Sequence, residues 1–239
     1  MNSPLSDISV VAVDLGERTI PYRDGWELQR RIHGEVVAGQ RSDTLLLMEH
    51  AEVFTAGSRT QLGDRPIDGS EVIDVDRGGR ITWHGPGQLV GYPIMRLPHP
   101  MDVVAHVRRL EALIIDVCQD FGVSAVQIEN RSGVWIHNPE VAGDLQSASK
   151  IAAVGIRVMQ GVTMHGFALN CNCDLEWSQR IVPCGIPDAG VTSLSHVIGR
   201  DIGVLDAAKV LTEHIKSEPD VPLSFSSERT HVVRSDRPA

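Results

Sequence analysis

The sequence predicts a single domain of the α/β (α+β) class, and three observations support this prediction. Apolar segments of strand length are mixed along the chain with longer segments of helical periodicity. The chain has 239 residues, 42% of them hydrophobic, which suits one sizeable core. Neither an internal repeat nor a hinge-like linker divides it. We therefore expect one domain over residues 1–216.

The N-terminal part is predicted to contain two strands with a helix between them. Ile8–Val13 and Thr44–Met48 are apolar runs of strand length. Tyr22–Val37 has an apolar stripe at helical spacing, and Gly39 follows as a helix-ending residue. The opposite face of this helix carries the arginines Arg23, Arg30 and Arg31.

The middle of the chain is predicted to add a long helix and four strands. Residues 102–121 place apolar side chains three and four positions apart, with Asp102 as the N-cap and Gly122 as the stop. The strands are Val72–Val75, Ile81–Trp83, Leu89–Met95 and Gly133–Ile136.

A β-hairpin is predicted where Lys150–Met159 and Val162–Asn170 flank the two-residue turn Gln160-Gly161. A two-residue turn sets the register, although a bulge would shift it by one residue and exchange the faces. Facing glycines weaken a sheet, so we expect them to leave room for a ligand chain. The register opposes Gly155 to Gly166, Val154 to Phe167, and Ala153 to Ala168.

The C-terminal region is predicted to contain a last helix over Leu205–Lys216. Residues 217–239 are rich in Pro, Ser and Arg and predict a poorly ordered tail. The polar segment 137–149 comes directly before Lys150 and predicts a mobile loop.

The net charge, the length of the apolar runs and the N-terminal sequence limit the class of protein. The chain has 22 Lys and Arg against 31 Asp and Glu, a formal net charge of -9, which disfavours general nucleic-acid binding. No apolar run approaches a membrane span, and the N-terminus lacks the features of a secretory signal. We therefore expect a soluble, cytoplasmic protein that binds neither nucleic acid nor membrane, with reduced cysteines.

The glycine-rich stretch RGGRITWHGPGQLVGYP, residues 77–93, is the first candidate for a binding site. A tight β-hairpin explains these glycines as well as close approach of a ligand does. Arg77 beside two glycines and His84 in a Gly-Pro loop favour the binding site. The glycine order matches neither a dinucleotide fingerprint nor a P-loop, so nucleotide binding by those routes is not expected.

Cys184 is the candidate nucleophile, because Val-Pro-Cys-Gly-Ile-Pro is a constrained turn whose backbone amides favour a thiolate. A buried turn cysteine is the alternative. Cys118 is interpreted as core, and the pair Cys171 and Cys173 lacks a second pair of ligands, so neither metal nor cofactor is expected. Without further information, Lys150 is typical of a solvated strand edge.

Four stretches, in this order, resemble the lipoyl(octanoyl) transferases of protein lipoylation: RGGRITWHGPGQLVGYP, KIAAVGIRV, HGFALNCNCDL and VPCGI. The likeness extends over about residues 20–200. It implies a mixed β-sheet flanked by helices, similar to the catalytic domain of biotin and lipoate protein ligases. It also implies transfer of an octanoyl group from octanoyl-acyl carrier protein to a specific lysine of lipoyl domains, through a cysteine acyl-thioester and without a cofactor. The implied acceptors are 2-oxoacid dehydrogenase complexes and the glycine cleavage H protein.

The resemblance assigns the acyl-carrying role to Cys184 and the partner role to Lys150. His165 is kept as a supporting candidate, although such a histidine is more often structural. We expect Val154 and Phe167 to wall an apolar groove for the acyl chain. The segments implied to contact substrate are Arg77, Gly78, Gly79, Arg80, Ile81, Thr82, Trp83 and His84; Ala153, Val154 and Gly155; and Gly166, Phe167 and Ala168.

Three other functions remain open on the sequence. An ATP-dependent lipoate or biotin ligase on the same fold would activate a free acid and need no cysteine, but residues 78–80 lack the third glycine usual in lipoate ligases. A non-catalytic carrier-protein binding module would form no covalent adduct. A thiol hydrolase would release free octanoate. Acidic partner proteins would need a local basic patch, for which the arginine face of the first helix is the candidate.

Overall fold

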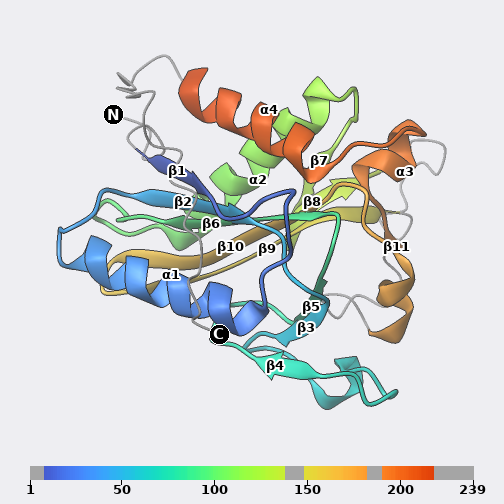
Figure 1. Ribbon diagram of the computed structural model, residues 1–239, viewed down its shortest axis with the longest axis horizontal. Helices are drawn as coiled ribbons and strands as arrows, with labels where there is room; N and C mark the ends of the chain where they lie inside the picture. Colours follow the sequence, from blue (N-terminus) through green and yellow to red (C-terminus); the bar gives the residue numbers. More distant parts are fainter. Residues whose placement is uncertain (1–7, 138–147, 182–189, 218–239) are drawn as a thin grey trace.

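The computed structural model describes residues 8–137, 148–181 and 190–217. A central β-sheet carries α2 (Val103–Asp120) and α4 (Val204–Ser217) on one face and α1 (Tyr22–Val37) on the other (Figure 1). The predicted mixed sheet flanked by helices is therefore confirmed.

The central sheet has eight strands in the order β1-β2-β6-β10-β9-β8-β7, with β11 paired to β9. β1 runs parallel to β2, and β11 runs parallel to β9, whereas the other neighbouring strands are antiparallel. The strands are β1 (Ser9–Ala12), β2 (Thr44–Met48), β6 (Gln88–Ile94), β7 (Val126–Ile128), β8 (Arg131–Ile136), β9 (Ser149–Met159), β10 (Val162–Asn170) and β11 (Gly190–Val191).

A smaller sheet, in the order β4-β3-β5, lies on the same side of the central sheet as α1 (Figure 1). Its strands are β3 (Val53–Ala56), β4 (Val72–Asp74) and β5 (Ile81–His84). Three short helices complete the described chain: η1 (Leu62–Asp64), η3 (Glu176–Arg180) and α3 (Leu194–Ile198).

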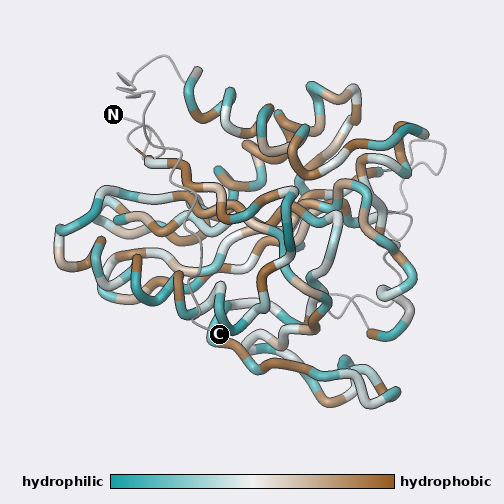
Figure 2. The backbone as a smooth tube through the Cα atoms, viewed as in Figure 1, coloured by the Kyte–Doolittle hydropathy of each residue, from teal (hydrophilic) through white to brown (hydrophobic). Residues whose placement is uncertain are grey.

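Hydrophobic side chains fill both faces of the central sheet. α2 and α4 bury Leu110, Ile114 and Leu211 in one cluster, and α1 buries Ile32 and Val36 in another. Figure 2 shows hydrophobic residues recurring along these helices between polar ones. This periodicity places one stripe of each helix against the sheet, where burial of apolar surface stabilises the fold.

The predicted helices form, with small differences at their ends. The first has the predicted bounds, and Asp102 caps α2 by accepting a hydrogen bond from the Ala105 amide at 2.8 Å. The last helix runs to Ser217, which removes that residue from the predicted tail. Residues 218–239 and most of segment 137–149 lie outside the described residues.

Six short elements of the described chain are not predicted from the sequence: β3, β7, β11, α3, η1 and η3. Each has two to five residues, too few to establish a periodicity. β3 depends on hydrogen bonds to β4 and β5, and β11 depends on β9. Their formation therefore depends on contacts between distant parts of the chain.

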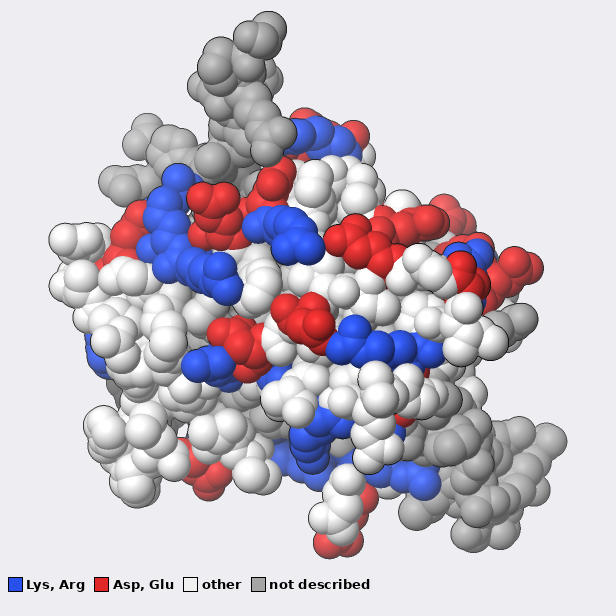
Figure 3. Space-filling model, turned by 90° about the horizontal axis from the view of Figure 1, so that it is seen from below, with Lys and Arg blue, Asp and Glu red and all other residues white. Residues whose placement is uncertain are grey.

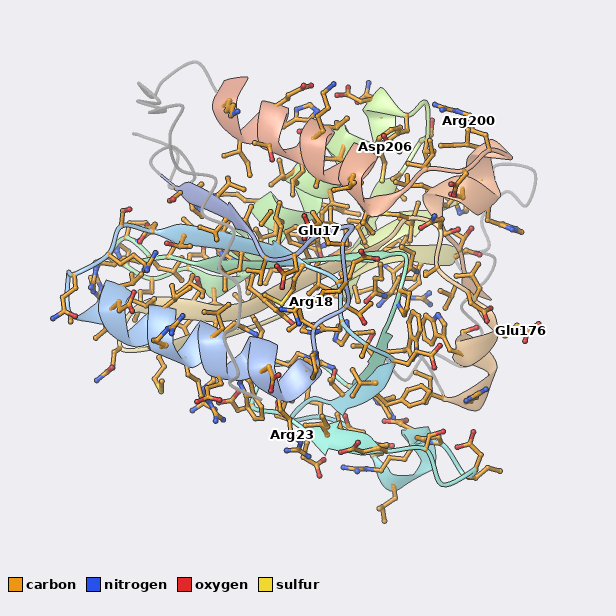
Figure 4. The ribbon with its side chains drawn as sticks, viewed as in Figure 1. Glu17, Arg18, Arg23, Glu176, Arg200 and Asp206 are labelled. Carbon is orange, nitrogen blue, oxygen red and sulfur yellow. The ribbon has the colours of Figure 1, made fainter. Side chains whose placement is uncertain are left out.

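No helix in the described part of the chain is both long enough and apolar enough to cross a membrane. On the face that carries α1 and the small sheet, basic and acidic side chains are interspersed (Figure 3). Arg23 extends from the start of α1 towards β4 (Figure 4) and forms an exposed ion pair with Glu71 at 3.3 Å. Part of the predicted basic face is thus already paired with an acidic side chain.

Candidate active site

The hairpin β9–β10 has the predicted register. Met159 pairs with Val162, and the three predicted pairs lie opposite each other. Gln160 and Gly161 have φ values of 53° and 76°, and two central residues with positive φ are typical of a type I′ turn. The two-residue turn therefore fixes which hairpin residues share a face of the sheet.

A cavity of about 390 Å³ lies beside this hairpin, a volume in the usual range of small-molecule sites. Seven lining residues were not singled out as site candidates by the sequence: Tyr22, Arg59, Gln61, Tyr92, Asn130, Arg131 and Ser132. Most of the predicted candidates also line it, namely Arg77, Gly79, Arg80, Thr82, His84, Lys150, Ala153, Val154, Gly155, His165, Gly166, Phe167 and Ala168.

Three predicted substrate contacts, Gly78, Ile81 and Trp83, lie outside the described lining of the cavity. Side chains alternate between the faces of a strand, so β5 directs Thr82 and His84 to the cavity and its other residues away from it. Ile81 is fully buried, and the Trp83 ring stacks on Trp177 with 4.7 Å between ring centroids. Ile81 and Trp83 therefore belong to a core cluster.

Gly155 and Gly166 allow close approach of the protein's own backbone. A Cβ at Gly155 would lie 2.9 Å from the Gly78 carbonyl oxygen, and one at Gly166 would overlap the Gly91 carbonyl. The Gly78 amide donates to the Ile156 carbonyl at 3.0 Å, which holds the glycine-rich loop against β9. Backbone therefore occupies the position that a Cβ would take at each glycine, both glycines line the cavity, and the room for a ligand chain stays a prediction.

Val154 and Phe167 border the cavity, but they belong to the core cluster beneath α2 and α4. Both residues therefore line the cavity as well as the core, and their role as walls of an acyl groove stays a prediction. Cross-strand partners share a face, so the neighbouring pair Ala153 and Ala168 points the other way. Ala168 accordingly packs in the cluster that includes α1. Both pairs thus contribute to the cavity lining, and Ala153 and Ala168 contribute its small side chains.

Arg77 holds the glycine-rich loop from inside. The residue is 7% exposed. Its guanidinium donates to the carbonyls of Gly78 and Arg80 at 3.0 and 2.9 Å, and to the carbonyl and hydroxyl oxygens of Thr55 at 2.8 and 2.9 Å. A rigid planar donor with several fixed acceptors sets the shape of the loop and its position against β3.

Arg80 is fixed by the buried carboxylate of Asp64. Its Nε and Nη2 donate to the two carboxylate oxygens at 2.8 and 2.5 Å, a bidentate arrangement. Asp64 Oδ2 also accepts from the Gln61 amide at 2.8 Å. This pair therefore joins η1 to the loop at the rim of the cavity.

His84 begins a buried polar chain that leads to the start of α3. Its Nδ1 lies 2.8 Å from Gln88 Oε1, so Nδ1 carries the hydrogen. The Gln88 amide donates to Asn170 Oδ1 at 2.8 Å, and the Asn170 amide donates to the Thr192 carbonyl at 2.9 Å. Burial holds the pKa of His84 well below its usual value, and its ring stacks on Tyr22. The His84 ring is therefore neutral at neutral pH and donates its Nδ1 hydrogen to Gln88.

A second buried histidine, His50, is hydrogen-bonded to Tyr92. Its Nδ1 donates to the Ile20 carbonyl at 2.9 Å, so its Nε2 accepts from the Tyr92 hydroxyl at 2.6 Å. Burial lowers the pKa of His50 to about 4 and raises the pKa of Tyr92 well above its usual value. Both groups are therefore neutral at neutral pH.

His165 is a buried, hydrogen-bonded residue with φ at 58°. Its Nε2 lies 2.7 Å from Asp76 Oδ1, and its backbone amide donates to Gln29 Oε1 at 3.0 Å. Burial lowers the pKa of His165, and the hydrogen bond from His165 lowers the pKa of Asp76. His165 pairs with Ile156, six residues along β9 from Lys150, and its supporting role stays a prediction.

Lys150 is buried at the edge of the cavity rather than solvated. It is 7% exposed, its Nζ donates to the Ser132 carbonyl at 3.0 Å, and the ammonium lies 4.5 Å from the centre of the Trp135 ring. Among the described residues, no carboxylate forms an ion pair with it. A buried cation held by neutral groups is suited to stabilise an anion that forms in the cavity.

Strand β11 lies next to Lys150. Val191 pairs with Lys150, and the Thr192 amide donates to the Lys150 carbonyl at 3.0 Å. The predicted nucleophile, Cys184, stands six positions before Gly190 in the sequence and lies outside the described residues. The described chain that follows Cys184 is therefore anchored beside the predicted partner lysine.

The other three cysteines are free and buried. Burial raises the pKa of both Cys118 and Cys173 to about 12, and it raises the pKa of Cys171 as well. These thiols are therefore protonated and poor nucleophiles. Within the described residues, no group of three or more His, Cys, Asp or Glu side chains is arranged to hold a metal ion.

Comparison with known proteins identifies the family. Residues 21–216 match the model of the lipoyl protein ligase A/B catalytic domain. The chain is similar to the octanoyltransferase of Salinispora tropica, with 57% identity over 215 residues that cover 90% of this chain and 97% of the relative. It is also similar to the octanoyltransferase of Thermobifida fusca, with 56% identity over 203 residues that cover 84% of this chain and 85% of the relative.

The fold is similar to a bipartite lipoate protein ligase from an archaeal lipoylation system, that of Thermoplasma acidophilum. The TM-score is 0.62 at 13% identity, over 87% of this chain and 82% of that chain. At this identity the likeness concerns the fold. The identity to the curated relatives shows more: the chain belongs to the octanoyltransferases, enzymes of the lipoyl protein ligase A/B catalytic domain family.

Proposed function

We propose that this enzyme moves an octanoyl group from octanoyl-acyl carrier protein to a lysine of lipoyl domains through a thioester on Cys184. The observation that carries the proposal is the buried ammonium of Lys150, which lines the cavity and has no carboxylate partner among the described residues. The family membership supports octanoyl as the transferred group.

In the first half-reaction, the Cys184 thiolate attacks the thioester carbonyl of the donor. The sulfur–acyl bond to the carrier breaks as the new one forms, and the carrier sulfur leaves with the proton that Lys150 donates, so that Lys150 becomes neutral. Thioester exchange is close to balanced in free energy, so this step needs no ATP. A cation beside a thiol favours the thiolate, and Lys150 supplies a cation in a setting of low solvent exposure.

In the second half-reaction, the lysine amine of the lipoyl domain attacks the acyl-enzyme. An amide bond forms, the Cys184 sulfur leaves, and one proton must depart from the attacking amine. Lys150 in its neutral form accepts that proton. Amide formation from a thioester is downhill, so this half needs no ATP either.

The acyl chain is proposed to lie along the hairpin, over the face that presents Ala153 and Ala168. The Gly78 loop rests on β9 at Ile156, which limits the groove at one end. A groove of fixed length selects the acyl chain because each methylene that is left exposed or forced to clash costs about 0.8 kcal/mol.

The proposed acceptors are the lipoyl domains of 2-oxoacid dehydrogenase complexes and the glycine cleavage H protein. The proposed compartment is the cytoplasm, which fits the free thiols of the described cysteines. Docking of acidic partners on the arginine face of α1 is part of the same proposal. Binding that weakens steeply with added salt would support it.

The nucleophile is tested by intact mass after mixing with octanoyl-acyl carrier protein. The wild-type enzyme should gain a hydroxylamine-labile octanoyl adduct, and Cys184→Ala should gain none. Cys118→Ala is the matched control, because it removes a buried core thiol and should keep the adduct. Transfer by Cys184→Ala at the wild-type rate would exclude this cysteine.

The lysine is tested by Lys150→Met, which keeps an unbranched side chain against Trp135. We expect transfer to fall at least about a hundredfold with the fold intact. A pH–rate profile unchanged from wild type would exclude Lys150 as the proton-handling group. The ligase alternative is tested in the same assay, because it requires ATP and magnesium and accepts free octanoate.

A further inference from the structure

We propose that Glu111 is a positioning residue for Lys150 and acts through the single peptide group that joins Ser132 to Gly133. The role builds on the proposed function, in which Lys150 handles the proton. Glu111 belongs to α2 and contacts the Gly133 amide, whereas Lys150 contacts the Ser132 carbonyl.

Glu111 is a fully buried carboxylate with both oxygens engaged. Its side chain is 0% exposed. Oε2 accepts from Arg108 Nη1 at 2.7 Å, and Oε1 accepts from the Gly133 backbone amide at 2.7 Å. A buried carboxylate is costly unless it is paired and hydrogen-bonded, so its removal leaves the Gly133 N–H without an acceptor.

The other end of that peptide group holds the catalytic amine. Its carbonyl oxygen belongs to Ser132 and accepts from Lys150 Nζ at 3.0 Å. In a planar trans peptide the N–H and C=O point in opposite directions. Glu111 and Lys150 therefore bind the two ends of one rigid dipole. Each hydrogen bond polarises the peptide in the direction that strengthens the other.

Gly133 makes this peptide dependent on an outside restraint. Its φ is 109°, in a region that favours glycine, and a Cβ there would lie 3.3 Å from Lys150 Nζ and 2.5 Å from the Ala152 carbonyl oxygen. The close packing of Lys150 thus requires glycine, whose backbone rotates more freely than that of other residues. The carboxylate of Glu111 restrains that rotation and keeps the Ser132 carbonyl directed at the amine.

Three variants separate positioning from general support of α2. Glu111→Leu has a similar size but no acceptor for the Gly133 N–H. Glu111→Gln keeps an acceptor oxygen. Arg108→Leu removes the ion pair and keeps the carboxylate, and Arg108 lies outside the cavity lining. Urea unfolding measures the stability of each variant, and octanoyl transfer gives its kcat and KM.

The decisive measurement is the rate at which acetic anhydride acetylates Lys150, read from peptide masses. An amine released from its carbonyl is more available to the reagent. We expect Glu111→Leu to raise this rate about tenfold and to lower kcat about tenfold with little change in KM, the size of effect of a hydrogen bond to a charged group. Glu111→Gln and Arg108→Leu should both stay within about threefold of wild type.

A Lys150 acetylation rate in Glu111→Leu equal to that of wild type overturns the inference. Equal effects of Glu111→Leu and Arg108→Leu overturn it too, because loss of α2 stability then explains both. If Glu111→Leu does not fold, Glu111→Asp carries the test, since its carboxylate is withdrawn from the Gly133 amide and should also raise acetylation.

This measurement is independent of the proposed chemistry. Acetylation of Lys150 requires neither the acyl donor nor Cys184. Full transfer activity in Lys150→Met would therefore contradict the proposed function, while the acetylation rates would still decide whether Glu111 positions the amine.

Discussion

The effect of replacing a glycine in this enzyme depends on its backbone conformation and on the atoms around it. Gly133 has positive φ and lies under the Lys150 side chain, whereas Gly34 lies on the exposed face of α1 with no atom near the position of a Cβ. The same substitution at these two glycines therefore has opposite consequences.

We expect Gly133→Ala to destabilise the fold by at least about 1 kcal/mol and to reduce octanoyl transfer more than stability alone explains. Gly34→Ala should stabilise the fold by roughly 0.5–1 kcal/mol, because alanine is the better helix former, and should leave activity unchanged. Urea unfolding and transfer rates of the two variants check this. A stable and active Gly133→Ala enzyme would contradict the described contacts.

At the scale of elements, the β9–β10 hairpin meets the glycine-rich loop and encloses the cavity. Ala153 is partly exposed on β9, lines the cavity and stands between Lys150 and the end closed by Gly78. A larger side chain there shortens the space for an acyl chain without entering the core beneath α2.

We expect Ala153→Leu to reduce transfer of octanoyl by about tenfold and to reduce transfer of butyryl much less, because the added methylenes occupy the space of the acyl tail. Competition between acyl carrier proteins loaded with four- and eight-carbon chains measures this preference. Equal loss for both chain lengths would place the acyl tail elsewhere.

At the scale of the whole molecule, burial of neutral histidines makes stability depend on pH. Burial lowers the pKa of His50 and of His106 to about 4, and it lowers the pKa of His84 well below its usual value. The unfolded chain binds these protons near pH 6.5, whereas the native state resists them. The contribution of each histidine is therefore full above about pH 6.5 and is lost as the pH falls towards 4.

We expect the free energy of unfolding to fall between about pH 6.5 and 4, and to fall less steeply in His106→Leu. His106 suits the test because its Nε2 is buried without a hydrogen-bond partner among the described residues. Urea titrations at several pH values provide the measurement. Parallel pH profiles for wild type and His106→Leu would show that His106 is not protonated on unfolding in this range.

The sequence by itself determined the elements with a clear periodicity and the register of the hairpin. The apolar stripe of Tyr22–Val37 defined α1, and the turn Gln160-Gly161 fixed every pair along β9 and β10. A helical stripe and a two-residue turn act over a few neighbouring residues, so the chain needs no distant partner to specify them.

Only the tertiary structure decided how distant residues meet. It placed Gly78 against β9, separated Thr82 from its neighbour Trp83, and brought Glu111 to the peptide that holds Lys150. Such contacts join elements far apart in the chain, and they depend on how whole helices and sheets pack. Local sequence patterns therefore do not predict these contacts. The arrangement of the site can be identified only once the elements have packed together.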